Sequence, residues 1–250
     1  MDHYQQIEIE IRGNGCVLWL NNPAKRNAMS SVLIEELMHF FSQEKLPYTF
    51  VMLAGKGECF AAGADLAEIS TVSQSEAIII SENLQSLFEQ MEYCKIPIIA
   101  AVHGYAVGGG LELALGTDLI FSTSGAWFQL PEVNFSLIPG GGATQRLTEI
   151  IGRRSAFFYM LTAEKISAAQ ALQMGIIQKI FSVDDFVNQV VAYLSGLTDK
   201  TNPATVSLLK RAIRSYGTSE GFIAESRGFA QLLVGEAQKK IRKFLGKESS

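Results

Sequence analysis

The chain has 250 residues, 48% of them hydrophobic, which is enough for one large core or for a core with a small helical appendage. Its formal net charge of −4 lacks the basic excess that is typical of nucleic-acid-binding proteins. No apolar run reaches the roughly 18 residues of a membrane span, and the polar N-terminal residues predict no secretory signal. We therefore expect neither a nucleic-acid partner nor a membrane partner.

Cysteine and histidine usage limits the possible cofactors and the compartment. The three cysteines have no CxxC spacing, so we expect reduced thiols, packed as small core residues, in a cytoplasmic protein. The three histidines form no set with carboxylates at metal-ligand spacing. We therefore predict that the protein binds no metal.

The first half of the chain alternates predicted strands with predicted helices. Apolar residues at every second position indicate a strand, and Ser30 or Ser31 is placed to cap a helix. Asp65 could cap a further helical turn, after a run of small residues that leaves the backbone accessible to a ligand. The predicted elements are strands over 7–12, 16–20, 50–54 and 98–102, and helices over 31–41, 73–93 and 111–115.

The second half of the chain is mostly helical. The predicted elements are strands over 118–122, 127–129 and 176–181, and helices over 143–151, 153–161, 168–174, 183–197, 204–216 and 219–245. The pattern as a whole predicts an α/β core over 1–195, with ligand contacts at loops that follow strands, and a helical region over 196–250. Helices at the end of a chain pack on their own core or cover a partner subunit.

Two glycine runs and two carboxylates stand out between residues 96 and 147. Gly108-Gly109-Gly110 follows a buried strand and precedes an apolar helix that contains Glu112. Glu132 follows twenty positions later (132 − 112), before a second glycine run at 140–142. Backbone N–H groups at a glycine-rich helix start suit a developing oxyanion, and a carboxylate among apolar residues gains a raised pKa that suits proton transfer.

Each of these signals has a structural alternative. A triple glycine before a helix is also typical of a tight turn, and a lone glutamate in an apolar helix usually faces water or an ion-pair partner. The arrangement of the signals, rather than any one of them, favours proton transfer next to a carbonyl group.

Five segments, in this order and with similar gaps, resemble the crotonase superfamily and within it the enoyl-CoA hydratases. They are LNNPAKRNAMS (20–30), CFAAGADL (59–66), IPIIAAVHGYAVGGGLELAL (96–115), LPEVNFSLIPGGGATQRL (130–147) and LTAEKISAAQALQMGII (161–177). The resemblance implies a crotonase-like spiral of ββα repeats, followed by a C-terminal helical trimerisation region. It also implies an acyl-CoA thioester substrate and a homotrimer or a dimer of trimers.

The resemblance assigns roles to individual residues. It implies that Glu112 and Glu132 are catalytic: Glu112 helps to activate water for attack at the β-carbon, and Glu132 delivers a proton to the α-carbon. It places the oxyanion hole at the backbone N–H groups of Ala64 and Gly109. It implies no separate cofactor, because coenzyme A is part of the substrate. The CoA-binding residues that it implies are Lys25, Arg26, Ala28, Ala62, Asp65 and Leu66.

Some positions depart from the pattern of this superfamily. Lys239-Lys240 stand where an acidic residue and a glycine are usual, and Ala143 replaces a common glycine. Phe244 and Lys247 match positions that can contact CoA from a neighbouring subunit, in altered surroundings. We expect segments 66–80 and 127–137 to line part of the acyl pocket, whose length preference the sequence leaves open.

Three functions remain compatible with the sequence. Hydration of trans-2-enoyl-CoA to 3-hydroxyacyl-CoA is favoured, because related isomerases often keep only the glutamate at the Glu132 position. A Δ3,Δ2-enoyl-CoA isomerase or another crotonase-type reaction is the first alternative. A non-catalytic or RNA-binding role is the second, and the acidic net charge gives it little support.

Overall fold

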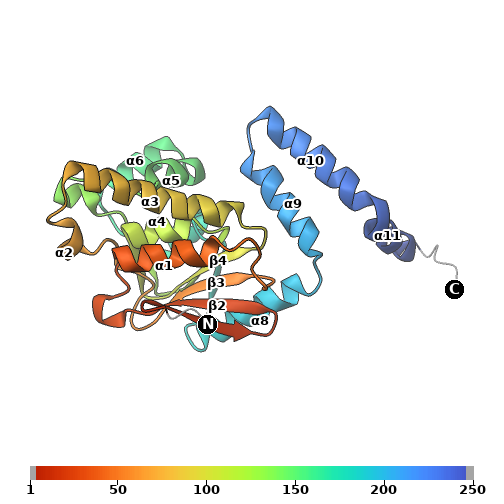
Figure 1. The fold of residues 1–250 in the computed structure, drawn as a ribbon, viewed down its shortest axis with the longest axis horizontal. Coiled ribbons are helices and arrows are strands. Elements are labelled where there is room, and N and C mark those ends of the chain that lie inside the picture. The colour runs from red at the N-terminus through yellow and green to blue at the C-terminus, as the bar shows by residue number, and fades with distance from the viewer. Residues whose placement is uncertain (1–3, 246–250) are drawn as a thin grey trace. The chain divides into compact units, whose positions relative to one another are not determined.

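A computed structural model of the chain describes residues 4–245. The chain divides into two compact units between Gly196 and Leu197, one residue beyond the boundary expected from the sequence. The first unit holds both sheets, and the second is helical (Figure 1).

The larger sheet has six strands in the order β1-β2-β3-β4-β6-β9. Its first pair is antiparallel, and every later pair is parallel. The strands are β1 (Ile7–Arg12), β2 (Gly15–Leu20), β3 (Val51–Gly55), β4 (Ile98–Val102), β6 (Leu119–Thr123) and β9 (Lys179–Phe181). The last is shorter than the strand expected over 176–181, because the backbone N–H groups of Ile176 and Ile177 donate to the Ala171 carbonyl oxygen.

A second sheet of three short strands lies in the order β5-β7-β8. The strands are β5 (Tyr105–Val107), β7 (Trp127–Gln129) and β8 (Ile166–Ser167). β5 pairs in parallel with β7, and Gly108, which follows β5, donates its backbone N–H to the Gln129 carbonyl oxygen (2.9 Å). This pairing fixes where the first glycine run begins.

Helices cover both faces of the larger sheet (Figure 1). In β3, Val51 and Leu53 pack on the side of α1, α3 and α4, whereas Met52 packs on the side of α8. The α-helices that begin in this unit are α1 (Ser31–Phe41), α2 (Leu66–Ile69), α3 (Gln74–Tyr93), α4 (Gly109–Leu115), α5 (Ala143–Ile151), α6 (Arg153–Thr162), α7 (Ala168–Gln173) and α8 (Phe186–Thr198). Short 3₁₀ helices occur at η1 (Pro23–Lys25) and η2 (Glu132–Phe135).

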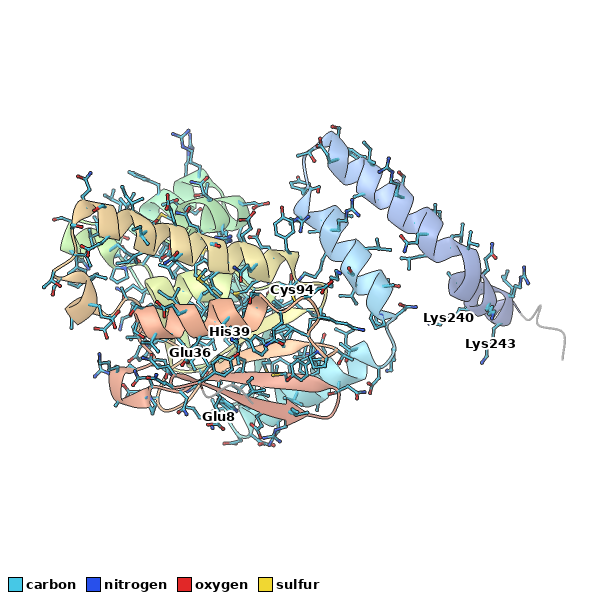
Figure 2. All side chains as sticks on the ribbon, in the orientation of Figure 1. Glu8, Glu36, His39, Cys94, Lys240 and Lys243 are labelled. Carbon is cyan, nitrogen blue, oxygen red and sulfur yellow. The ribbon has the colours of Figure 1, made fainter. Side chains whose placement is uncertain are left out.

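Side chains of α1 hold the segment that leads into β1. Glu36 accepts the backbone N–H groups of Gln6 (2.9 Å) and Ile7 (3.0 Å), and the His39 ring contacts the Tyr4 hydroxyl at 2.9 Å. Figure 2 labels Glu36 and His39 on this helix. The Ser30 hydroxyl accepts the Leu33 N–H, which confirms the predicted cap.

The second unit contains α9 (Pro203–Arg214), α10 (Ser219–Leu232), a π-helical segment (Leu233–Ala237) and α11 (Gln238–Phe244). The sequence predicts one helix over 219–245, and this expectation is wrong. Val234 and Gly235 leave helical geometry, and Gly235 has a φ of 111°, which glycine adopts without strain.

Candidate active site

A cavity of about 940 Å³ lies in the first unit, at the loops that follow β2, β3 and β5. All the residues that the sequence assigns to catalysis, the oxyanion hole and CoA binding line this one cavity. They are Lys25, Arg26, Ala28, Ala62, Ala64, Asp65, Leu66, Gly109, Glu112 and Glu132. Parallel strands end at the same sheet edge, so loops far apart in sequence meet there.

Glu112 lies in the middle of α4 and is only 3% exposed. Its Oε1 accepts the backbone N–H groups of Gly141 (2.8 Å) and Ala143 (3.0 Å). Burial raises the pKa of Glu112, while these two N–H groups and the Arg146 guanidinium oppose the rise. The carboxyl group is therefore held in one orientation, by donors that favour its ionised form.

Glu132 begins η2 and has a different environment. A Cβ atom at Gly108, whose φ is 51°, would lie 3.1 Å from Glu132 Oε1, so the glycine allows the carboxyl group to approach the start of α4. Glu132 Oε2 is buried without a hydrogen-bond partner within residues 4–245. Burial, and then the nearby Glu112 carboxylate, raise the pKa of Glu132 from 4.5 to about 7.

The backbone N–H groups of Ala64 and Gly109 come from different loops and lie close together. A Cβ atom at Gly109 would be 3.7 Å from the Ala64 nitrogen. Gly63 permits this approach, because its φ is 95° and a Cβ atom there would lie 2.8 Å from the Val107 carbonyl oxygen. In the described part of the chain, neither N–H donates a backbone hydrogen bond, so both can serve a ligand.

The two cations at the mouth of the cavity form ion pairs. Lys25 Nζ lies 2.7 Å from Asp65 Oδ2, and Arg26 Nε lies 3.1 Å from Glu58 Oε1. The hydrogen bond from Lys25 lowers the pKa of Asp65, whose other oxygen accepts the Ala67 N–H and caps α2 as predicted. Lys25 thus ties the loop after β2 to the loop after β3.

Asn27 does not line the cavity but supports it from the buried side, and no motif in the sequence pointed to this role. It is fully buried, and its Nδ2 donates to the carbonyl oxygens of Lys56 (2.9 Å), Cys59 (3.1 Å) and Phe60 (3.1 Å). Its φ of 54° lies in the left-handed region, which asparagine tolerates better than most residues. An asparagine in a polar loop is therefore the local sequence signal for such a role. Asn27 therefore fixes the loop after β3 on which Ala64 lies.

Both segments that the sequence predicts to line the acyl pocket, 66–80 and 127–137, contribute residues to the cavity wall. Trp127 does not line it; its ring stacks on Tyr105 at 4.9 Å, with Lys165 Nζ at 3.8 Å from the ring centre. The apolar lining comes from α1, α2, α3 and the segment after η2, and includes Ile34, Ile69, Ile80, Leu84, Leu137 and Ile138. Of these, Ile69, Ile80 and Leu137 belong to the predicted segments.

Residues 4–245 contain neither a candidate metal site nor a candidate membrane-spanning helix. Within that range no cluster of three or more histidine, cysteine or acidic residues has the geometry to hold a metal ion. No helix in the same range combines the length and the apolar character needed to cross a membrane. No disulfide joins Cys16, Cys59 and Cys94.

Comparison with known proteins places this chain in a family. The profile of the enoyl-CoA hydratase/isomerase family matches residues 10–246. A probable enoyl-CoA hydratase of Mycobacterium leprae is 30% identical, over 95% of this chain and 90% of its own. A short-chain-enoyl-CoA hydratase of Clostridium acetobutylicum is 31% identical, over 93% and 91%.

A solved structure gives the same answer for the fold. The enoyl-CoA hydratase subunit I of Geobacillus kaustophilus superposes with a TM-score of 0.89 at 32% identity, over 99% of this chain and 98% of that one. The mixed α/β unit with C-terminal helices is therefore a crotonase fold, as the five segments predicted. The chain is an enzyme that belongs to the enoyl-CoA hydratase/isomerase family.

Proposed function

We propose that the protein adds water to trans-2-enoyl-CoA thioesters to give 3-hydroxyacyl-CoA. The observation that carries this proposal is the contrast between two carboxyl groups in one cavity. Two backbone N–H groups hold Glu112, whereas Glu132 has an unpartnered oxygen and a pKa of about 7. Backbone donors thus oppose the rise that burial causes in the pKa of Glu112, whereas the pKa of Glu132 is raised to about 7, as a base and an acid acting together require.

The proposed reaction begins at the thioester carbonyl oxygen, which accepts the N–H groups of Ala64 and Gly109. Glu112 removes a proton from water as the water oxygen bonds to the β-carbon. The electron pair of the double bond moves toward the carbonyl, where the oxyanion hole stabilises the enolate-like charge. Glu132 then gives its proton to the α-carbon, and exchange with solvent returns Glu112 and Glu132 to their starting states.

The remaining site residues support CoA binding in this proposal. The loop of Lys25, Arg26 and Ala28 and the backbone of Ala62, Asp65 and Leu66 would hold the adenine and pantetheine portions. The Lys25 side chain is 57% exposed in spite of its ion pair, so its remaining N–H donors can reach a phosphate. Coenzyme A enters as part of the substrate, and the active form is a homotrimer or a dimer of trimers.

The test is loss of enoyl-thioester absorbance when the purified protein is mixed with crotonyl-CoA. We expect rapid loss in the wild type, and a decrease of about 100-fold or more in Glu112→Gln and Glu132→Gln with acyl-CoA binding retained. Glu164→Gln, an exposed glutamate outside the cavity, is the matched control.

The alternative reaction is tested in the same assay. A wild type that leaves 2-enoyl-CoAs of several lengths unchanged but converts 3-enoyl-CoAs would be an isomerase that uses Glu132 as its proton carrier. Full hydratase activity in Glu132→Gln would remove that residue from the proposed mechanism.

A further inference from the structure

The short loop over residues 140–143 connects Glu112 with helix α3. On one side of the loop, the N–H groups of Gly141 and Ala143 donate to Glu112 Oε1 at 2.8 and 3.0 Å. The orientation of Glu112 therefore depends on how firmly the loop that carries these donors is fixed. The carbonyl groups of Gly140 and Gly141 show what holds it.

Two side chains of α3 bind the Gly140 carbonyl oxygen. Ser81 Oγ donates to it at 2.6 Å, and Gln85 Nε2 donates to the same oxygen at 3.0 Å. Gln85 Nε2 also lies 3.1 Å from Ser81 Oγ, so the two side chains support each other one helical turn apart. A carbonyl oxygen with two donors has both lone pairs occupied, which restrains the peptide that follows it.

The next carbonyl group is also tied to α3, through an arginine. Arg146 Nη1 donates to the Gly141 oxygen (3.2 Å), and its Nε and Nη2 lie 2.9 and 2.8 Å from Glu92 Oε1. The loop is therefore attached to the same helix at two successive peptide groups. Its carbonyl groups at Gly140 and Gly141 face α3 and Arg146, whereas its N–H groups at Gly141 and Ala143 donate to Glu112.

Helix α3 is also a wall of the cavity. Ala77, Ile80, Ser81 and Leu84 line it, on the same helical face as the residues that bind Gly140. An acyl chain that packs on this wall would press on the helix that holds the loop. Ser81 belongs to both surfaces, since it lines the cavity and binds the loop.

We propose that Ser81, supported by Gln85, is a positioning residue for Glu112, and that it links the acyl-chain wall of α3 to the loop over residues 140–143. This inference rests on the proposed hydratase function. Without the Ser81 hydroxyl the loop gains freedom, so the N–H groups of Gly141 and Ala143 spend less time on the Glu112 carboxylate. The Glu112 carboxyl group is then less firmly oriented, and its ionised form is less stable.

The effect on proton affinity has a definite sign. Besides the N–H groups of Gly141, Gly142 and Ala143, the charged group that acts on the pKa of Glu112 is Arg146 on α5. The other charged group nearby is Glu132 on η2, whose own pKa the Glu112 charge raises. Neither is altered by a change at Ser81. Weaker donation from the loop therefore raises the pKa of Glu112, and the acid limb of the pH–rate profile moves to higher pH.

The experiment compares Ser81→Ala, Gln85→Met and the double variant with the wild type on crotonyl-CoA and on longer 2-enoyl-CoAs. We expect Ser81→Ala to lower kcat by about 10- to 100-fold with a smaller change in KM, and to shift the acid limb upward. Ser81→Thr, which keeps the hydroxyl, should restore both properties. Ser86→Ala makes the same substitution five residues further along α3 and should match the wild type.

A second measurement separates this inference from the proposed function. The infrared band of the protonated Glu112 carboxyl, assigned with Glu112→Gln, is titrated in the protein without substrate. We expect its midpoint to rise in Ser81→Ala but not in Ser86→Ala. If the wild type hydrates no substrate, the proposed function fails, but this titration still tests the positioning role. An unchanged midpoint and unchanged kcat in folded Ser81→Ala would overturn the inference.

Discussion

Glu132 combines a raised pKa with a buried oxygen that has no hydrogen-bond partner in the described residues. Such a group is costly to ionise, because water can no longer solvate the charge and the Glu112 carboxylate repels it. A residue chosen for stability alone would be expected to have a partner. The arrangement is instead what a proton donor working near neutral pH requires.

The free-energy cost of ionising Glu132 in the folded protein can be measured, because it makes the stability of the protein depend on pH. The pKa of Glu132 is about 7 in the folded protein against 4.5 ordinarily, so the folded state binds the proton more tightly. Below pH 4.5 both states are protonated, and Glu132→Gln should match the wild type. As the pH rises through 7, the free energy of unfolding of the wild type should fall relative to the variant, by at most about 3 kcal/mol.

Chemical denaturation at pH 5 and pH 8 measures this difference. The exposed Glu164→Gln is the control, and its stability should follow that of the wild type at both values. The repulsion between the two carboxylates, which is already part of this pKa shift, disappears in Glu132→Gln. A variant that gains nothing at pH 8 would show that Glu132 ionises there without cost.

At this scale the sequence could identify the carboxylates but not what orients them. Glu112 and Glu132 lie in recognisable motifs, and both line the cavity. Ser81 and Gln85 lie in a polar helix, 59 and 55 residues from the carbonyl oxygen that they bind. Sequence spacing has no local signal for such a contact, because only the packing of α3 on the folded core brings the groups together.

Helix α4 depends on close approach of its backbone to the loop after β3. A Cβ atom at Gly110 would lie 2.5 Å from the Ala61 carbonyl oxygen and 2.7 Å from the Ala61 Cβ. The second distance is far shorter than van der Waals contact, and the first involves backbone that cannot rotate away. The glycine run therefore serves packing at Gly110, beside the N–H donor role that we propose for Gly109.

Gly110→Ala should destabilise the protein, although alanine is the better helix former by about 1 kcal/mol. Overpacking costs typically about 1–3 kcal/mol and outweighs that gain. Gly125→Ala, where no atom lies within 4 Å of the new Cβ, should stay within about 0.5 kcal/mol of the wild type. Denaturation midpoints of the two variants test this, and equal midpoints would mean that the loop after β3 moves aside without cost.

Helix starts were more predictable than short strands. Ser30, Asp65 and Ser167 accept N–H groups at the starts of α1, α2 and α7, because capping depends on residues two or three positions away. β5 was missed, since Tyr105–Val107 is short and pairs with a strand about twenty residues further on. Its existence depends on tertiary contacts that no local pattern carries.

At the scale of the whole molecule, the second unit presents apolar side chains that nothing within it covers. On α10, Phe222 is 76% exposed and Phe229 is 66% exposed, and only Gly228 of that helix is buried. Exposure of several large apolar groups on one helix is unfavourable in water, at about 25 cal/mol for each Å². The amphipathic pattern predicts helices here, but it leaves open whether they cover their own core or a partner.

Phe244 is 87% exposed, and Lys247 lies outside the described residues, so the proposed contact of this pair with CoA across subunits stays a prediction.

We expect the protein to sediment as a trimer of about 82 kDa (three times 27.3 kDa) or as twice that mass. Phe222→Glu places a charge on the exposed apolar face of α10 and should shift the sedimentation profile toward monomer at micromolar concentration. Gln231→Glu adds the same charge at an exposed polar position of the same helix and should leave the assembly intact. A wild type that sediments as a monomer would refute the oligomer, and the apolar residues of α10 would then have to be covered within one chain.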